Sequence, residues 1–429
     1  MRKILMFLMA LALAFTFAVP AFALENIFGG YWRTRAYIQQ DFTGDDSGDL
    51  DLTQTTTRTR LYYTAKFNEN FQFVNKFEMD AVFGGQDRKF DIDGDGSKEV
   101  IGSSYGNIGA DGVSVEVKNS YADMTFDKTN VKLGVQGTTI CRGFIFDDDF
   151  AGTVVTYKAS DTLSIPLMWI KANEGGQGED ANDYDVDYYA VYPTVNLGKA
   201  TVKPLLMWTT SSDASSFAGD STIDKWNVYY LGADVDANVG PASVWFTGIY
   251  EFGTIKGAGT ADDTDVGAYL LGLGASTDVD KVSVHGQIFY ASGQDPDEED
   301  ITAFFVPAGQ SYYWSEIMGY GIFDDMDVSN NSPADQISDI MALNLGAAFK
   351  ATDKLTLNAD LWYAQLAEDD ANGNTDLGME IDLGLSYSVL DNVTLDVVAA
   401  YLVAGDSTTE EVSNDENPME MGVQLSFSF

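Results

Sequence analysis

The arginines of this 429-residue chain lie in its first third. Beyond Arg2 they occupy six positions: Arg33, Arg35, Arg58, Arg60, Arg88 and Arg142. Guanidinium groups bind carboxylates and phosphates through paired hydrogen bonds, so such a cluster is a candidate anion contact. Two pairs are spaced by two residues, which places both members of each pair on the same face if the segment is a β-strand.

Acidic residues dominate the charge of the whole chain. There are 66 acidic and 24 basic residues, which give a formal net charge of −42. That charge repels nucleic acid, so no nucleic-acid partner is expected. The acids gather between apolar segments, which favours acidic loops over an evenly charged surface. The group Asp147, Asp148 and Asp149 has two interpretations: counter-charge for the arginines, or an ordinary solvated loop.

A second acidic pattern points to a metal. Asp91, Asp93 and Asp95 alternate ahead of Gly96, as carboxylates do in the first half of an EF-hand calcium loop. Gly102 stands at the twelfth position, where such a loop carries a bidentate Glu. A structural calcium site and a plain acidic turn therefore both remain open, and no other cofactor is expected.

His285 is the only histidine and Cys141 the only cysteine. One thiol provides neither an internal disulfide nor a Cys-rich metal site. Ser283 shares a strand face with His285, but the sequence identifies no acid that would orient the histidine, as a catalytic triad requires. The chain is therefore not expected to be an enzyme.

The elements that must position these side chains alternate between apolar and polar residues. From 71 to 83, apolar side chains take one parity and Lys76, Glu78 and Asp80 take the other, and the tail to Phe429 alternates in the same way. A period of two places the two sets on opposite faces of a strand. A transmembrane β-barrel requires this partition, because lipid offers the backbone no hydrogen-bond partners and only a closed sheet satisfies every strand.

Short and long connections alternate along the chain. Short turns lie at 68–70, 127–130, 159–161, 197–199, 237–240, 278–280, 351–354 and 391–392, and long connections near 41–52, 84–112, 141–151, 174–184, 210–222, 254–264, 293–336, 368–376 and 404–417. These connections predict an all-β fold, a transmembrane antiparallel up-and-down β-barrel of about 18 strands, with about 16 as the alternative. The short turns are expected to be periplasmic and the long acidic loops extracellular.

Residues 1–23 begin with a basic pair, continue through an apolar run and end in Ala21-Phe22-Ala23. This order predicts a cleaved secretory signal peptide, followed by the barrel at 24–429. After it, no stretch approaches the ~18 apolar residues that a membrane helix needs.

The signal peptide, the arginine-bearing early strands, the tail ending at Phe429 and the segment 143–150 together resemble the outer-membrane porins of Gram-negative bacteria. The resemblance implies a water-filled channel for ions and small hydrophilic solutes in an outer membrane of lipid and lipopolysaccharide. It also implies that 141–151 is a constriction loop, that the barrel-assembly machinery reads Phe429, and that the protein is a homotrimer. The alternatives are a solute-selective channel with a binding site in the lumen and, least supported, a barrel enzyme.

On the two early strands, four arginines share the polar parity and are expected to face the lumen, because Arg facing lipid near the midplane costs ~2–4 kcal/mol. Charged rings and pore diameter set selectivity in channels, so an eyelet of basic wall and acidic loop is predicted. The predicted pore-lining and constriction residues are Arg33, Arg35, Arg58, Arg60, Asp147, Asp148 and Asp149. Selectivity for cations or anions, and the role of 293–336, stay open.

Overall fold

The computed structural model describes residues 24–42, 51–84, 89–90, 99–100, 115–175, 185–211, 223–258, 262–323, 337–370, 372–409 and 416–429. The predicted signal peptide at 1–23 and the candidate calcium ligands Asp91, Asp93 and Asp95 lie outside these residues. Among the described residues, no helix has both the length and the hydropathy needed to cross a membrane.

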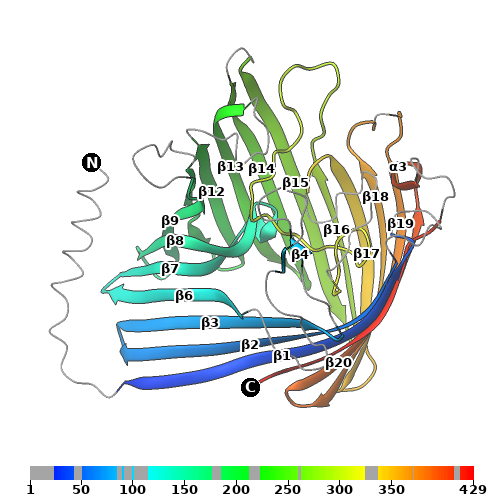
Figure 1. Cartoon of the computed structure of the whole chain (residues 1–429), viewed down its shortest axis with the longest axis horizontal. Helices are drawn as coiled ribbons and strands as arrows, with labels where there is room; N and C mark the ends of the chain where they lie inside the picture. The colour runs from blue at the N-terminus through cyan, green and yellow to red at the C-terminus, as the bar shows by residue number, and fades with distance from the viewer. Residues whose placement is uncertain are drawn as a thin grey trace.

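Antiparallel strands form one continuous sheet that curves around a central space (Figure 1). Its strands are β1 (Glu25–Gln40), β2 (Leu52–Asn68), β3 (Phe71–Val82), β6 (Val115–Phe126), β7 (Thr129–Ile140), β8 (Phe146–Lys158), β9 (Leu163–Asn173), β10 (Val186–Val191), β11 (Thr194–Asn196), β12 (Ala200–Ser211), β13 (Ile223–Val239), β14 (Ala242–Gly257), β15 (Thr264–Val279), β16 (Val282–Ala291), β17 (Ile340–Lys350), β18 (Leu355–Leu366), β19 (Asp376–Leu390), β20 (Val393–Ala404) and β21 (Met419–Ser428). The other elements are the ribbon of β4 (Lys89–Phe90) with β5 (Glu99–Val100), the 3-10 turn η1 (Cys141–Gly143) and the short helix α3 (Asp406–Thr409).

The sheet closes into a barrel of eighteen strand positions. Each strand pairs with the next along the chain, and β1 pairs with β21 as well as with β2. β10 and β11 share one position, because both lie between β9 and β12 and are separated by Tyr192-Pro193. Proline cannot donate to the ladder, which explains the break. The prediction of eighteen strands is confirmed over the alternative of sixteen.

The C-terminal residue completes the seam between β1 and β21. The N–H of Gly30 donates to the carbonyl of Phe429 at 2.9 Å, and the N–H of Phe429 donates to the carbonyl of Gly30 at 3.1 Å. The Phe429 ring lies against Gly30, and a Cβ there would overlap it. The alternating tail therefore supplies the last strand of a sheet without open edges, which is what lipid demands.

The outer face carries apolar side chains with large exposed fractions. Along β15, Leu271 and Leu273 are 46% and 53% exposed, whereas Ala268 and Leu270 on the opposite face are fully buried. The same outward pattern recurs on β13, β17, β19 and β21. Contiguous apolar surface of this extent has to be covered, and the hydrocarbon of a bilayer covers it on every side of a barrel.

This outer face leads to a depth-dependent prediction. We expect Leu271→Arg to lower the free energy of unfolding in lipid vesicles by about 2–4 kcal/mol, because the cation would face the hydrocarbon midplane. The matched control is Thr277→Arg, which lies on the same face of β15 near its short turn, where the cost falls to about 0–1 kcal/mol. Denaturant titration of both variants measures the difference, and equal losses would contradict a lipid-facing surface.

The inner face is polar along β1 to β3 but apolar along much of β13 to β17. Two inward-folded segments account for this difference from the predicted polar lining. The first, here called the third turn, is Cys141–Ile145, and the second, here called the inner strap, is Ile301–Phe323. Both belong to the same apolar core as the inward side chains of β13 to β17. The lumen is therefore partly filled by protein, and the segment 293–336 in its described part folds inward.

Candidate functional site

The basic wall of the lumen is built by β2 and neutralised by β3. Arg58 contacts Asp80 through two hydrogen bonds, Nε to Oδ1 at 2.8 Å and Nη2 to Oδ2 at 2.5 Å, and Glu78 at 3.3 Å. Arg60 forms a close ion pair with the buried Glu78. The antiparallel register places Arg58 opposite Asp80 and Arg60 opposite Glu78, so charge pairs form directly across the strands.

Arg35 lies on the same face of β1 as Arg33, but its guanidinium binds the inner strap. It is 5% exposed, and its Nη1 donates to the carbonyls of Ile322 at 2.8 Å and Phe323 at 2.9 Å. These carbonyls belong to the end of the inner strap, so Arg35 anchors the strap to β1. Arg33 lies opposite Arg58 in the register of β1 and β2 and extends the basic wall.

The three aspartates of the predicted constriction lie on β8 and not on a free loop. β8 begins at Phe146, and Asp147, Asp148 and Asp149 pair in register with β7. Asp149 contacts Lys118 at 3.2 Å and accepts a hydrogen bond from Asn119 at 2.8 Å. The eyelet formed with the arginines therefore stays a prediction.

The third turn is held inside the barrel by Arg142, an arginine to which the sequence assigned no role. Its backbone has a φ of 62°, in the left-handed region. The guanidinium pairs with Asp234 at 2.9 Å, forms a second ion pair with Asp236, and lies 4.7 Å above the ring of Trp245. Two carboxylates and an aromatic face make this a strong contact for a planar cation.

The residues beside Arg142 are packed and not exposed to the channel. Cys141 is fully buried, and its backbone N–H donates to the hydroxyl of Tyr192 at 3.2 Å. Burial raises the pKa of the Cys141 thiol to about 12, so it remains protonated and acts as a small packing residue. Phe144 stacks on Tyr312 of the inner strap at 3.9 Å, which joins the two inward segments.

Carboxylate groups of the barrel wall bind the backbone of the inner strap. Glu380 on β19 accepts hydrogen bonds from the backbone N–H of Ile317 at 2.7 Å and of Met318 at 2.9 Å, and from the hydroxyl of Ser315 at 3.0 Å. Glu251 on β14 accepts from the N–H of Phe305 at 2.8 Å. Because the described part of the strap joins no strand ladder along this stretch, these carboxylates satisfy backbone donors that would otherwise be buried unpaired.

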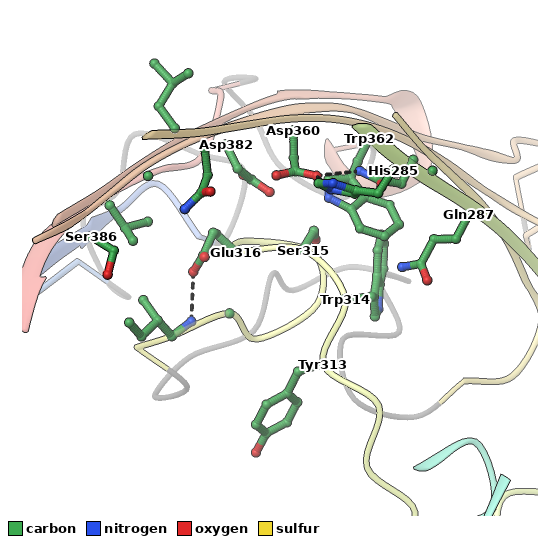
Figure 2. A pocket seen from close by; sticks show the side chains of 18 of the residues that line it. His285, Gln287, Tyr313, Trp314, Ser315, Glu316, Asp360, Trp362, Asp382 and Ser386 are labelled. Atoms are coloured by element: carbon green, nitrogen blue, oxygen red, sulfur yellow. Dashed lines mark hydrogen bonds and ion pairs between the residues drawn. The ribbon is translucent and has the colours of Figure 1, made fainter. Parts of the chain in front are cut away.

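A cavity of about 610 Å³ lies between the strap and the wall of β16 to β20 (Figure 2). Aromatic and polar side chains line it together, among them Tyr313 and Glu316 from the strap and Trp362 from the wall. His285 and Asp360 form a contact of 2.7 Å on the wall side. Asp360 is thus the acidic neighbour of His285 that the sequence did not identify, because the two residues are 75 positions apart.

Closed antiparallel barrels with chain segments inside the lumen occur among outer-membrane proteins. Pseudomonas aeruginosa OccK9 (OpdG) matches with a TM-score of 0.60 and 12% identity over 94% of this chain and 98% of that chain. OpdK of the same organism, solved with vanillate, matches at 0.58 and 12%, and OccK2 (OpdF), in complex with glucuronate, at 0.58 and 11%, each over the same shares. These neighbours are outer-membrane porins, and at such identities the likeness establishes a shared fold. No family model matches the sequence, and no curated protein sequence matches it.

Proposed function

We propose that this chain is an outer-membrane porin that conducts ions and small hydrophilic solutes by diffusion. The observation that carries the proposal is the side-chain partition of a closed barrel: apolar residues outside, and charged rows such as Arg58 with Asp80 inside. Soluble monomers rarely expose contiguous apolar surface of this extent, whereas a barrel surrounded by lipid requires it. The cellular location that fits is the outer membrane of a Gram-negative cell, with lipid and lipopolysaccharide around the barrel.

The solute-selective alternative has an observation in its favour. The strap and the third turn narrow the lumen, and the cavity beneath the strap presents aromatic faces beside hydrogen-bonding side chains. Binding sites for small molecules combine these features. Vanillate and glucuronate, found with two structural neighbours, are both carboxylates. We infer that small organic acids are the first solutes to test, with the basic wall of β1 and β2 as their contact.

Planar-bilayer recording of the detergent-extracted protein tests both versions. Discrete conductance steps that scale with salt concentration are expected for a diffusion channel. A conductance that saturates, or that falls as an organic acid is added, is expected when the lumen holds a binding site. Purified protein that is freely soluble without detergent and produces no steps would overturn the proposal.

The basic wall is tested by the double variant Arg58→Gln and Arg60→Gln. We expect the reversal potential in a salt gradient to shift toward cations, with the permeability ratio of K⁺ to Cl⁻ rising several-fold. The reason is that Glu78 and Asp80 would lose their paired cations and leave net negative charge in the lumen. Lys281→Gln, at a short turn outside the lumen, is the control. An unchanged reversal potential in the double variant would remove the basic wall from selectivity.

Assembly is a further part of the proposal. The seam contacts of Phe429 with Gly30 support a role for the terminal residue in closing the barrel. We propose that the barrel-assembly machinery recognises the alternating tail. We also propose that the assembled protein is a homotrimer. The candidate eyelet of Arg33, Arg35, Arg58 and Arg60 with Asp147 to Asp149 belongs to the same proposal.

A structural calcium at Asp91, Asp93 and Asp95 is tested by calorimetric titration with millimolar calcium.

A further inference from the structure

The inner strap carries one carboxyl group that lines the same cavity as several acidic residues of the wall. Glu316 belongs to the strap, and its Oε2 accepts the N–H of Ile322 at 2.7 Å, which closes a local turn (Figure 2). The same cavity is lined by Asp360 on β18, Asp382 on β19 and Asp396 on β20. Figure 2 shows the carboxyl groups of Asp360 and Asp382 on the wall side of that cavity and that of Glu316 on the strap side, where its hydrogen bond stays within the strap.

Two more carboxyl groups belong to the same wall. Glu380 on β19 holds the strap backbone and is fully buried, and Glu420 on β21 accepts a hydrogen bond from Gln39 at 2.6 Å. Within the described part of the chain, Asp382 Oδ1 and Glu420 Oε1 are buried oxygens without a hydrogen-bond partner. An ionised oxygen in that position is costly, so this wall disfavours any further negative charge that the strap brings to it.

The cations that the described residues bring to this wall are few. Arg35 on β1 is one, and its Nη1 donates to two backbone carbonyls of the strap, those of Ile322 and Phe323. His285 on β16 is the other when protonated, and it is already in contact with Asp360. Ionisation of Glu316 would therefore add a negative charge to a cavity where acidic groups outnumber cations, and like charges in one cavity repel one another.

We propose that the inner strap is a proton-controlled gate, docked on the wall of β18 to β21 while Glu316 is protonated and released toward the lumen when Glu316 ionises. The inference rests on the proposed channel function for its physiological meaning. Its structural part, the docking of the strap, stands on the contacts alone.

The direction of the pH effect follows from the carboxyl group itself. Burial raises the pKa of Glu316 from its ordinary 4.5 to about 7, and the nearby Glu380 and Asp360 add to the rise, while the hydrogen bond from Ile322 opposes it. The docked strap thus keeps a proton that a released strap loses. Docking is strongest below about pH 4.5, weakens as the pH rises to about 7, and stays weak above that. Each pH unit within this window lowers the docking equilibrium about tenfold.

Thiol labelling tests the docking directly. In a Cys141→Ser background, Met318→Cys and, separately, Ile317→Cys place a thiol on strap residues that are fully buried against the wall. Labelling rates in proteoliposomes are measured from pH 5 to 8 with a thiosulfonate reagent. Each rate is divided by that of the exposed Asn372→Cys variant, which removes the intrinsic pH dependence of thiols. We expect the relative rate to rise at least about tenfold across this range, following the docking equilibrium.

Glu316→Gln is the decisive variant, because it keeps the shape and an acceptor for Ile322 but cannot ionise. We expect it to abolish the rise in labelling and to hold single-channel conductance at its acidic value. Glu299→Gln, an exposed carboxyl in the connection that leads to the strap, is the matched control and should behave as wild type. Labelling that does not change with pH, or that changes equally in both glutamine variants, would overturn the gate. Absence of conductance with normal labelling would instead contradict the channel function.

Discussion

Replacing Glu380 with alanine is expected to detach the inner strap and to lower the free energy of unfolding by about 4 kcal/mol. The Glu380 carboxylate accepts hydrogen bonds from the backbone N–H groups of Ile317 and Met318 and from the Ser315 hydroxyl. Each buried donor left without a partner costs about 1–3 kcal/mol. Denaturant titration in vesicles measures the loss, and faster labelling of the Met318→Cys thiol reports the detachment.

Two comparisons separate this effect from a general loss of charge. Asp396→Ala removes a carboxyl that lines the same cavity, and we expect a smaller loss of stability from it. Glu380→Gln retains one acceptor oxygen and should fall between wild type and alanine. If the alanine variant is as stable as wild type and its strap remains protected, the carboxylate does not anchor the strap.

Arg142→Ala is expected to release the third turn and to cost about 3–5 kcal/mol, because it leaves the buried Asp234 without its cation. Its guanidinium also covers Trp245, so the tryptophan environment should change. Intrinsic fluorescence and denaturant titration report the two effects. The single-channel conductance of the variant should rise, since Cys141–Ile145 would no longer be held against β13.

Arg142→Lys is the informative comparison for this site. Lysine keeps the charge but cannot bind Asp234 and Asp236 through a planar fork, so a partial loss is expected. Lys132→Ala, which removes a cation lying over the ring of Tyr121 on another part of the barrel, serves as the control. A lysine variant as unstable as the alanine variant would show that geometry, and not charge, holds the third turn.

The alternation of the sequence predicts part of the basic wall. Glu78 and Asp80 share the polar parity of their strand, as Arg58 and Arg60 do on theirs. Which carboxylates neutralise which arginines depends on the register between β2 and β3, which places Arg58 opposite Asp80. The sequence pattern pointed to 147–149 as the nearest acidic run, but proximity in a barrel follows strand pairing and not the density of charge along the chain.

Asp360 shows the same limit for a single residue. It contacts His285 across two strands, since β16 and β18 both pair with β17. No local pattern links the two positions. The buried cluster around Glu316 is likewise composed of residues from distant segments, and its acidity appears only when the strap lies on the wall.

What the sequence determined by itself is the transmembrane β-barrel class and its strand number to within about two. Strand periodicity is local, with each odd and even position sorted between hydrocarbon and lumen, and the turns mark where the direction reverses. What only the tertiary structure decided is how the lumen is filled: Arg142 tying the third turn to β13, Arg35 and Glu380 holding the inner strap. These contacts join residues that are 92, 287 and 63 positions apart. Such pairings depend on which loop can reach which strand once the cylinder has closed, and no local period encodes that.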